Sequence, residues 1–158
     1  MSHARKEYTD FEKLAPDVFA VVRDLGQFAA KAGLDKQLLE LVKLRASQIN
    51  GCAFCVQYHI LQGESLGVPI DKLNLVVVWR EVPQFSARER AALAWAETVT
   101  RVAQTAIPDQ DYQAARAVFN EKQLVDLTIA IGLMNTYNRI AIGFRNPPQA
   151  VVEHSAAA

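Results

Sequence analysis

The sequence predicts an all-α fold. Apolar residues recur at helical spacing in nearly every segment, and no run shows the strict alternation of apolar and polar residues that is typical of a half-buried strand. The 158 residues, of which 51% are hydrophobic, are enough to bury a substantial core within one domain. We therefore expect a single compact multi-helix domain over residues 1–158, with a flexible tail from about residue 147.

Residues that begin and end helices divide the chain into seven predicted helices. Gly33 and Asn50-Gly51 are expected stops, because glycine accepts the left-handed conformation that closes a helix, and Asp35 is an expected N-cap. The stretch Ser86–Glu89 has the spacing of a capping box. The predicted helices cover residues 16–33, 36–49, 52–66, 70–81, 87–104, 109–119 and 121–144.

The last predicted helix is unusually apolar. Between Leu127 and Ile142 it carries a single charged residue, Arg139, so most of its circumference must be buried. A small monomer rarely covers one terminal helix to this extent, and we expect a homo-oligomer. The segments "LELVKLRASQIN" and "VDLTIAIGLMNT", which contain Glu40 and Asp126, also resemble each other; the two explanations are an internal helix-pair repeat and a chance likeness between helices.

The charges of the chain balance, with 17 basic and 17 acidic residues scattered along it. This pattern offers no basic surface for nucleic acid or for an anionic membrane, so neither partner is expected. No window is long and apolar enough for a membrane-spanning helix, and "MSHARKEYTDFEK" at the N-terminus lacks the apolar segment of a signal peptide. We expect a soluble cytoplasmic protein, in a compartment where close cysteines are more often catalytic or metal-binding than structural.

Both cysteines of the chain and its only mid-chain histidine lie in the stretch "INGCAFCVQYH", residues 49–59. A helix that starts after Asn50-Gly51 places Cys52 in its first turn and Cys55 one turn later on the same face. The free amides and the dipole of that helix end favour a thiolate over a thiol. His59 falls on the same stripe, four residues beyond Cys55, where its ring can exchange a proton with the sulfur.

This arrangement meets the requirements of thiol-based peroxide reduction. A thiolate attacks a peroxide oxygen and becomes a sulfenic acid, and a second thiol within reach condenses with it to a disulfide before further oxidation. Other interpretations remain open. In the first, the two cysteines are small apolar core residues without a chemical role. In the second, Cys52, Cys55, His59 and Glu40 supply the four ligands of a zinc site, although structural zinc sites usually draw two ligand pairs from separate elements. A dithiol-disulfide exchange protein or redox sensor is the functional alternative.

The run "RASQINGCAFCVQYH", with Glu40 twelve positions before Cys52, resembles the core motif of the alkylhydroperoxidase D-like proteins, within the carboxymuconolactone decarboxylase superfamily. The resemblance continues through "ARERAALAWAE" and "LVDLTIAIGLMNTYNRIAIGFR" and so covers nearly the whole chain. It implies an all-helical protein that assembles as trimers or hexamers and reduces organic hydroperoxides or hydrogen peroxide. The decarboxylase branch generally lacks the cysteine pair, so decarboxylation is not expected here.

The resemblance also implies the role of each site residue. Cys55 is the peroxidatic sulfur, Cys52 is the resolving sulfur, and His59 and Glu40 form a proton relay; on the residues alone, Glu40 would be a solvated glutamate. No bound cofactor or metal is expected, and a lipoyl or thioredoxin-like protein serves as the dithiol reductant. One position departs from the pattern, because the best-known peroxidases carry a second histidine where this chain has Phe54.

The remaining residues of note receive no chemical role. His3 and His154 lie near the chain ends, and Trp79 and Trp95 have aliphatic neighbours at helical spacing, which predicts core or interface positions. The polar stretch "NTYNR", residues 135–139, is expected to make buried hydrogen bonds, either within the fold or across a subunit boundary.

Overall fold

The structure is a computed structural model that describes residues 6–31 and 33–148. Within these ranges all regular secondary structure is helical, which confirms the predicted fold class. The elements are α1 (Tyr8–Leu14), α2 (Pro16–Lys31), α3 (Lys36–Asn50), α4 (Ala53–Ser65), α5 (Ile70–Asn74), the 3₁₀ helix η1 (Leu75–Glu81), α6 (Ala87–Thr100), α7 (Val102–Thr105), α8 (Asp109–Arg116) and α9 (Glu121–Gly143). The predicted flexible tail falls largely on residues 149–158, outside the described ranges.

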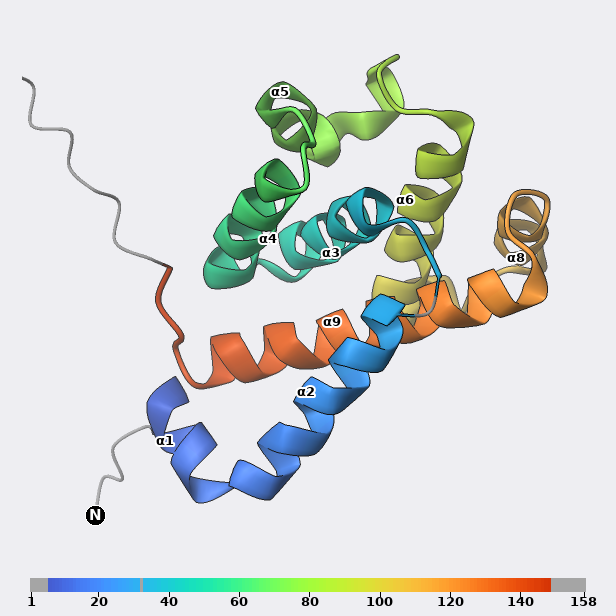
Figure 1. The fold of residues 1–158 in the computed structure, drawn as a ribbon. Helices are drawn as coiled ribbons and strands as arrows, with labels where there is room; N and C mark the ends of the chain where they lie inside the picture. Colours follow the sequence, from blue (N-terminus) through green and yellow to red (C-terminus); the bar gives the residue numbers. More distant parts are fainter. Residues whose placement is uncertain (1–5, 32, 149–158) are drawn as a thin grey trace, which may run out of the picture.

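The long helix α9 runs between two groups of helices (Figure 1). Helix α3 packs against α4, α6 and α9, and helix α2 packs against α9 from the other side. The two segments of the internal likeness, in α3 and α9, therefore lie in contact. Helices α2, α3, α4 and α9 enclose the region in which the two cysteines lie.

Local signals in the sequence account for the ends of these helices. The Asp35 side chain accepts a hydrogen bond of 2.8 Å from the Leu38 amide and so caps α3. Gly51 ends α3 in the left-handed region, with φ of 70°, where a side chain would be strained. Ser86 and Glu89 form the predicted capping box at the start of α6.

Three predicted helices were wrong in their bounds, and one helix was not predicted. Helix α1 was not predicted, since it is too short to show a periodicity; it is held by Phe11, which packs on Phe19 and Phe144. Residues 70–81 form two elements because the β-branched run "VVV" disfavours an α-helix. The predicted helix 87–104 breaks at Arg101, after the β-branched residues of "TVT". Helix α8 ends at Arg116, whose guanidinium caps the Phe119 carbonyl at 2.6 Å.

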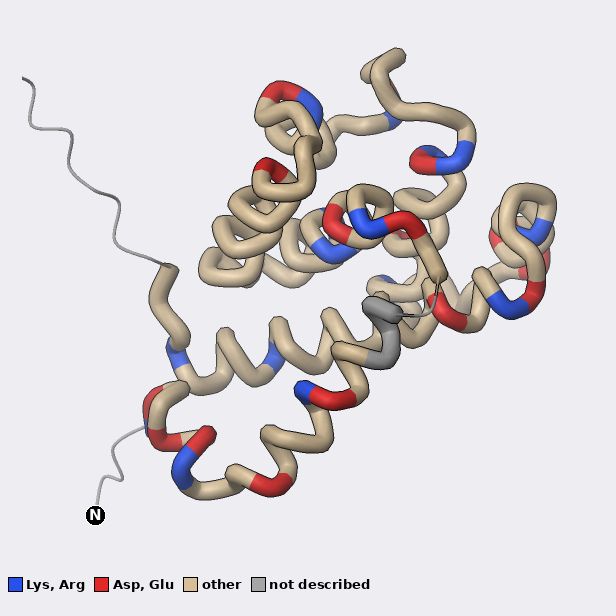
Figure 2. Tube along the Cα trace, viewed as in Figure 1, with Lys and Arg blue, Asp and Glu red and all other residues tan. Residues whose placement is uncertain are grey.

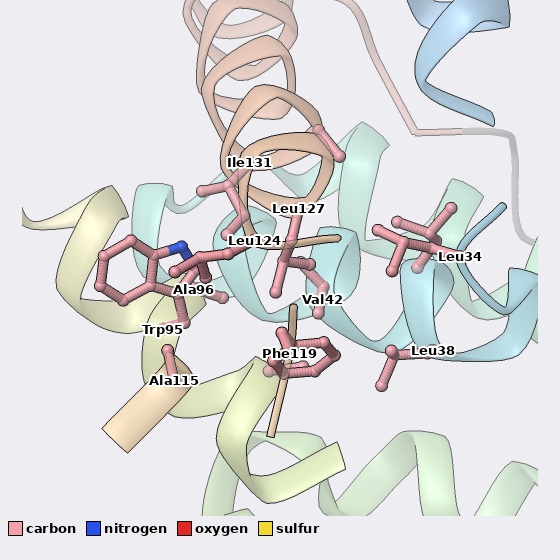
Figure 3. Packing of buried hydrophobic residues seen from close by; sticks show 13 residues of the cluster. Leu34, Leu38, Val42, Trp95, Ala96, Ala115, Phe119, Leu124, Leu127 and Ile131 are labelled. Carbon is pink, nitrogen blue, oxygen red and sulfur yellow. The ribbon is translucent and has the colours of Figure 1, made fainter. Parts of the chain in front are cut away.

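Two large apolar clusters hold the helices together. One is shown in Figure 3, where Trp95, Phe119 and Leu127 come from different parts of the chain to the same core. The other surrounds Trp79. Both tryptophans are thus buried in the core of the single chain, and of the two predicted locations, core or interface, they occupy the core. A third, smaller cluster joins the cysteines to α3 and α9; it contains Ala46, Cys52, Cys55, Met134 and Ala141.

Charged residues are interspersed along most helices, whereas α9 is uncharged over much of its length (Figure 2). None of the helices in the described ranges combines the length and apolar character that crossing a bilayer requires. Helices α3, α4 and α9 carry the buried polar residues Glu40, Ser47, His59 and Asn138.

Candidate active site

The cysteine pair sits at the start of α4. Cys52 is the N-cap residue, and its sulfur accepts a hydrogen bond of 3.3 Å from the Cys55 amide. Cys55 lies in the first turn, and the two residues form a disulfide with their Cα atoms 5.3 Å apart. Cys52 is thus one position earlier than predicted, so its sulfur is the one that caps the helix. Both side chains are buried, with 1% and 4% of Cys52 and Cys55 exposed.

Glu40 and His59 form a buried pair between α3 and α4. The Oε2 atom of Glu40 lies 2.7 Å from Nδ1 of His59, and the side chains of Glu40 and His59 are only 9% and 8% exposed. The ammonium of Lys43 donates to the other oxygen of Glu40 at 2.8 Å. Glu40 is therefore a buried hydrogen-bond partner of His59 and not the solvated glutamate that the residues alone would predict.

The pKa values of this pair indicate a neutral imidazole beside a carboxylate. Burial lowers the pKa of His59, and its contacts with Glu40 oppose this effect only in part. Burial alone would raise the pKa of Glu40, but the hydrogen bond from His59 and the charge of Lys43 outweigh it and lower the pKa. The carboxylate must accept the Nδ1 proton, which leaves the lone pair of His59 on Nε2.

Met134 covers this basic nitrogen. Its sulfur lies 3.0 Å from Nε2 of His59, and its side chain is buried on the inner face of α9. No sequence pattern singles out Met134, since a methionine in an apolar helix is ordinarily a core residue.

A cavity of about 380 Å³ opens beside the disulfide and the imidazole. Its volume falls within the range of small-molecule sites. Cys55 lines it and Cys52 does not. Phe54, which occupies the position of the second histidine in the best-known peroxidases, also lines it and stacks on Tyr58 with ring centroids 6.0 Å apart. The lining residues are Tyr8, Gly26, Leu39, Lys43, Phe54, Cys55, Tyr58, His59, Ala130, Leu133, Met134, Tyr137, Ala141 and Asn146.

A set of amides fixes the turn that precedes Cys52. The side-chain amide of Asn50 donates to Asn138 at 2.8 Å and to Asn135 at 2.9 Å, and Asn138 donates to Ser47 at 3.2 Å. Asn138 is fully buried, and Arg139 donates to the Asn135 carbonyl at 2.8 Å. The polar stretch of α9 thus makes hydrogen bonds within the fold, which was the first of the two predicted alternatives. These hydrogen bonds join α9 to the end of α3.

The four predicted site residues lie in one region as two bonded pairs, Cys52 with Cys55 and Glu40 with His59. Cys55 and His59 are four residues apart on α4 and line the same cavity. Across residues 6–31 and 33–148, no group of three or more histidine, cysteine, aspartate or glutamate side chains is arranged to hold a metal ion. The zinc interpretation therefore gains no support from the arrangement of these residues.

The family assignment rests on this fold and on the sequence. The chain belongs to the carboxymuconolactone decarboxylase family, whose sequence profile matches residues 16–98, and within that superfamily it is an alkylhydroperoxidase D-like protein. The uncharacterised protein YdfG of Bacillus subtilis is 31% identical over 136 residues, which are 86% of this chain and 92% of YdfG.

Solved structures of other proteins share the fold. A protein of unknown function from Agrobacterium tumefaciens, proposed to be the antioxidant defence protein AhpD, superposes with a TM-score of 0.88 at 40% identity, over 92% of this chain and all of that one (100%). The debrominase Bmp8, also solved with 2,3,4-tribromopyrrole, has a TM-score of 0.80 at 16% identity, over 87% of this chain and 74% of its own. At that identity Bmp8 shows likeness of fold only.

Proposed function

We propose that this protein is a thiol-dependent peroxidase that reduces organic hydroperoxides or hydrogen peroxide with the Cys52–Cys55 dithiol. The observation that carries the proposal is the shared cavity, which is lined by both Cys55 and the imidazole of His59. The buried carboxylate of Glu40 lies at Nδ1 of this imidazole and leaves Nε2 as the basic nitrogen. The likeness to the A. tumefaciens protein proposed for antioxidant defence supports the same activity.

The reaction begins from the reduced dithiol. The Cys55 thiolate attacks the outer oxygen of the hydroperoxide, so an S–O bond forms, the O–O bond breaks, and the leaving alkoxide takes up a proton and departs as an alcohol. The Cys52 thiol then attacks the sulfenic sulfur of Cys55, which yields the disulfide and water. A protein dithiol of the lipoyl or thioredoxin type reduces the disulfide, and this requirement favours the reducing cytoplasm as the site of action.

His59 supplies the proton transfers in this scheme. Its Nε2 lone pair accepts the thiol proton of Cys55 and passes it to the leaving alkoxide, while Glu40 fixes the tautomer through Nδ1. Phe54 provides an apolar wall where the best-known peroxidases have a second histidine, so the relay consists of Glu40 and His59 alone. Met134 has to move away from Nε2 before a proton can pass.

The assignment of the two sulfurs is tested with the matched variants Cys52→Ser and Cys55→Ser. Each reduced variant receives a pulse of cumene hydroperoxide in the presence of dimedone, which labels sulfenic acid, and the labelled peptide is measured by mass spectrometry. We expect label on Cys55 in Cys52→Ser and none in Cys55→Ser. The reverse pattern would exchange the two roles, and no label in either variant would refute the peroxidase proposal.

A dithiol-disulfide exchange protein or redox sensor is the competing function. Stopped-flow measurement of hydroperoxide consumption by the pre-reduced protein, with excess dithiol as reductant, separates the two functions. A peroxidase consumes many equivalents of hydroperoxide rapidly, whereas an exchanger or sensor reacts slowly or sub-stoichiometrically. Bmp8 is a debrominase, so 2,3,4-tribromopyrrole is a suitable control substrate. If this protein released bromide from it faster than it reduced the hydroperoxide, the result would argue for dehalogenation.

We also propose that the protomers associate through the outer face of α9, as trimers or hexamers. Val125, Ile129, Gly132 and Thr136 follow the spacing of a helix-packing stripe and are all exposed in the single chain. Light scattering coupled to size-exclusion chromatography gives the mass directly. Ile129→Glu should lower the mass of the assembly, whereas the substitution Gln113→Glu at an exposed position of α8 should leave it unchanged and serves as the control. A monomeric wild-type protein would refute the proposal.

A further inference from the structure

Met134 is a reactive sulfur in the candidate site that the peroxidase scheme does not use. The chain contains four sulfur-bearing residues, two cysteines and two methionines, and in the described part of the chain only Cys55 and Met134 bring sulfur to the cavity lining. The structure shows the disulfide form, in which neither cysteine is a nucleophile. A hydroperoxide that enters this form therefore meets Met134 as the one remaining sulfur that it can oxidise.

From this geometry we infer that Met134 is an oxidation site, converted to the sulfoxide by hydroperoxide once Cys52 and Cys55 are joined, and that this modification switches off the imidazole of His59. The inference rests on the proposed function for the identity of the oxidant and for the proton relay that the modification stops. The contact that carries it is the 3.0 Å distance between the Met134 sulfur and Nε2 of His59 at the wall of the cavity.

The oxidation step balances without a further reactant. A lone pair of the Met134 sulfur attacks the outer oxygen of the hydroperoxide, an S–O bond forms, and the O–O bond breaks with release of an alkoxide. The sulfur loses two electrons and the hydroperoxide gains them. Nε2 of His59 takes the proton from the hydroxysulfonium that forms and delivers it to the alkoxide, so the products are methionine sulfoxide and an alcohol.

The product changes what faces His59. A thioether is a weak acceptor, whereas a sulfoxide carries a strongly polar oxygen. The sulfur now lies 3.0 Å from Nε2, which is too close for an oxygen to fit between them, so oxidation pushes the Met134 side chain back and turns the sulfoxide oxygen toward Nε2. This oxygen repels the Nε2 lone pair unless Nε2 carries a proton. Because Glu40 already accepts the Nδ1 proton, the sulfoxide stabilises the doubly protonated ring, hydrogen-bonded on both sides. An imidazolium cannot accept the thiol proton of Cys55, so the relay stops.

The first test measures the rate of oxidation. The disulfide form is exposed to excess cumene hydroperoxide, and trypsin then releases residues 123–139, which contain Met134 as their only methionine. We expect this peptide to gain one oxygen atom faster than a free methionine peptide does, and His59→Gln to slow the gain by about 10²-fold. A rate no faster than that of the free peptide, or one unchanged in His59→Gln, would overturn the inference.

The second test measures the consequence. Met134→Leu preserves the volume of the side chain but cannot be oxidised. Each protein is compared with its own initial turnover rate: during prolonged exposure to hydroperoxide the variant should keep its initial rate, whatever that is, while the wild type declines. Methionine sulfoxide reductase should restore the wild type, and the His59 pKa, followed by NMR, should rise on oxidation. If Met134→Leu declines at the wild-type rate, with the cysteine peptides carrying the added oxygen, thiol over-oxidation is responsible and the switch is refuted.

A third variant separates this inference from the peroxidase proposal. In the double variant Cys52→Ser, Cys55→Ser no thiol chemistry is possible, yet Met134 and His59 keep their contact. Sulfoxide formation in the double variant, together with absent turnover in the wild type, would support the oxidation site and refute the peroxidase. Turnover in the wild type with no sulfoxide in either protein would support the peroxidase and refute the oxidation site.

Discussion

The carboxylate of Glu40 lies 2.7 Å from Nδ1 of His59, and it joins α3 to α4 beneath the cavity. This contact determines which nitrogen of the ring carries the proton, and Lys43 determines how strongly the carboxylate is held in its charged form. The two neighbours act on the imidazole in opposite directions, because Glu40 raises the pKa of His59 whereas Lys43 lowers it.

Replacing Glu40 by glutamine should weaken His59 as a base. Glu40→Gln removes the negative charge that opposes the effect of burial, so the pKa of His59 falls further and the tautomer is no longer fixed. We expect kcat/KM for a hydroperoxide to fall about 10–100-fold, the size of effect seen when an orienting partner of a histidine is removed.

The acid side of the pH–rate profile distinguishes this effect from simple loss of structure. The profile should move to lower pH in Glu40→Gln, because the ring stays neutral to lower pH. In the matched variant Lys43→Met it should move to higher pH, because the ammonium that lowers the His59 pKa is gone. Movement of both profiles in the same direction would be incompatible with the proposed electrostatics.

Glu97 should make stability depend on pH in the acid range. This buried carboxylate accepts hydrogen bonds from Arg45 at 2.7 Å, Trp79 at 2.9 Å and Arg80 at 2.6 Å. Burial alone would raise its pKa, but these donors together lower it. As the pH falls, Glu97 takes up a proton in the unfolded chain before it does so in the folded protein. Its contribution to the free energy of unfolding is therefore complete above the ordinary glutamate pKa, and it is lost as the pH falls toward the lower pKa that Glu97 has in the folded protein.

The corresponding variant is Glu97→Gln. Since it leaves Arg45 facing a neutral amide in a buried position, urea denaturation at pH 7 should show a loss of about 1–3 kcal/mol in the free energy of unfolding. The difference from the wild type should shrink toward pH 3. Asp71→Asn on α5 serves as the control; equal losses at both pH values would show that Glu97 acts through its shape and not through its charge.

Asn138 should be the most sensitive polar residue of α9. Asn138→Leu removes the acceptor of Asn50 and the donor to Ser47, so that both partners lose a hydrogen bond in an enclosed region. We expect a loss of about 2–3 kcal/mol in the free energy of unfolding. Gln113→Glu on α8, an exposed position outside the proposed interface, should change it by less than about 0.5 kcal/mol. Tolerance of Asn138→Leu would show that the turn before Cys52 is held by its backbone alone.

Gly63 should not tolerate a side chain. A Cβ atom at this position would lie 2.7 Å from Cδ2 of Leu73, a fully buried residue of α5, so that α4 or the Leu73 side chain has to shift within the core. Gly63→Ala should therefore destabilise the protein by about 1–3 kcal/mol in thermal or urea unfolding. At Gly143 an added Cβ meets no atom within 4 Å, and Gly143→Ala should be neutral or slightly stabilising. Equal behaviour of the two variants would mean that α5 shifts readily.

Signals that act within a few residues made much of the fold predictable from the sequence. Asp35 caps α3, Gly51 ends it, and the Ser86–Glu89 capping box starts α6, because each depends on hydrogen bonds or backbone angles close by in the chain. The helix ends that failed lie at β-branched runs, where an apolar periodicity continues although the helix does not. The pairing of Cys52 with Cys55 was predictable for the same local reason.

The parts of the site that join distant segments could not be predicted from spacing. Met134 reaches His59 from 75 residues away, and Asn138 reaches Asn50 across 88. On helical pattern alone, Glu40 is indistinguishable from a surface glutamate, and only its place in a family motif marked it. Lys43 was within reach of local reasoning, because a lysine three residues after a glutamate on a helix lies beside it.

The hydrogen bonds of Asn50 also bear on the chemical ageing of the chain. An asparagine followed by glycine is the dipeptide that most readily cyclises to a succinimide and deamidates when the backbone is free to bring the glycine nitrogen onto the side-chain carbonyl carbon. Here the Asn50 amide is held by Asn135 and Asn138, and the Gly51 N–H is turned toward the Gln48 carbonyl. The fold that sets Cys52 in place thus also protects the residue before the turn from slow conversion to aspartate or isoaspartate.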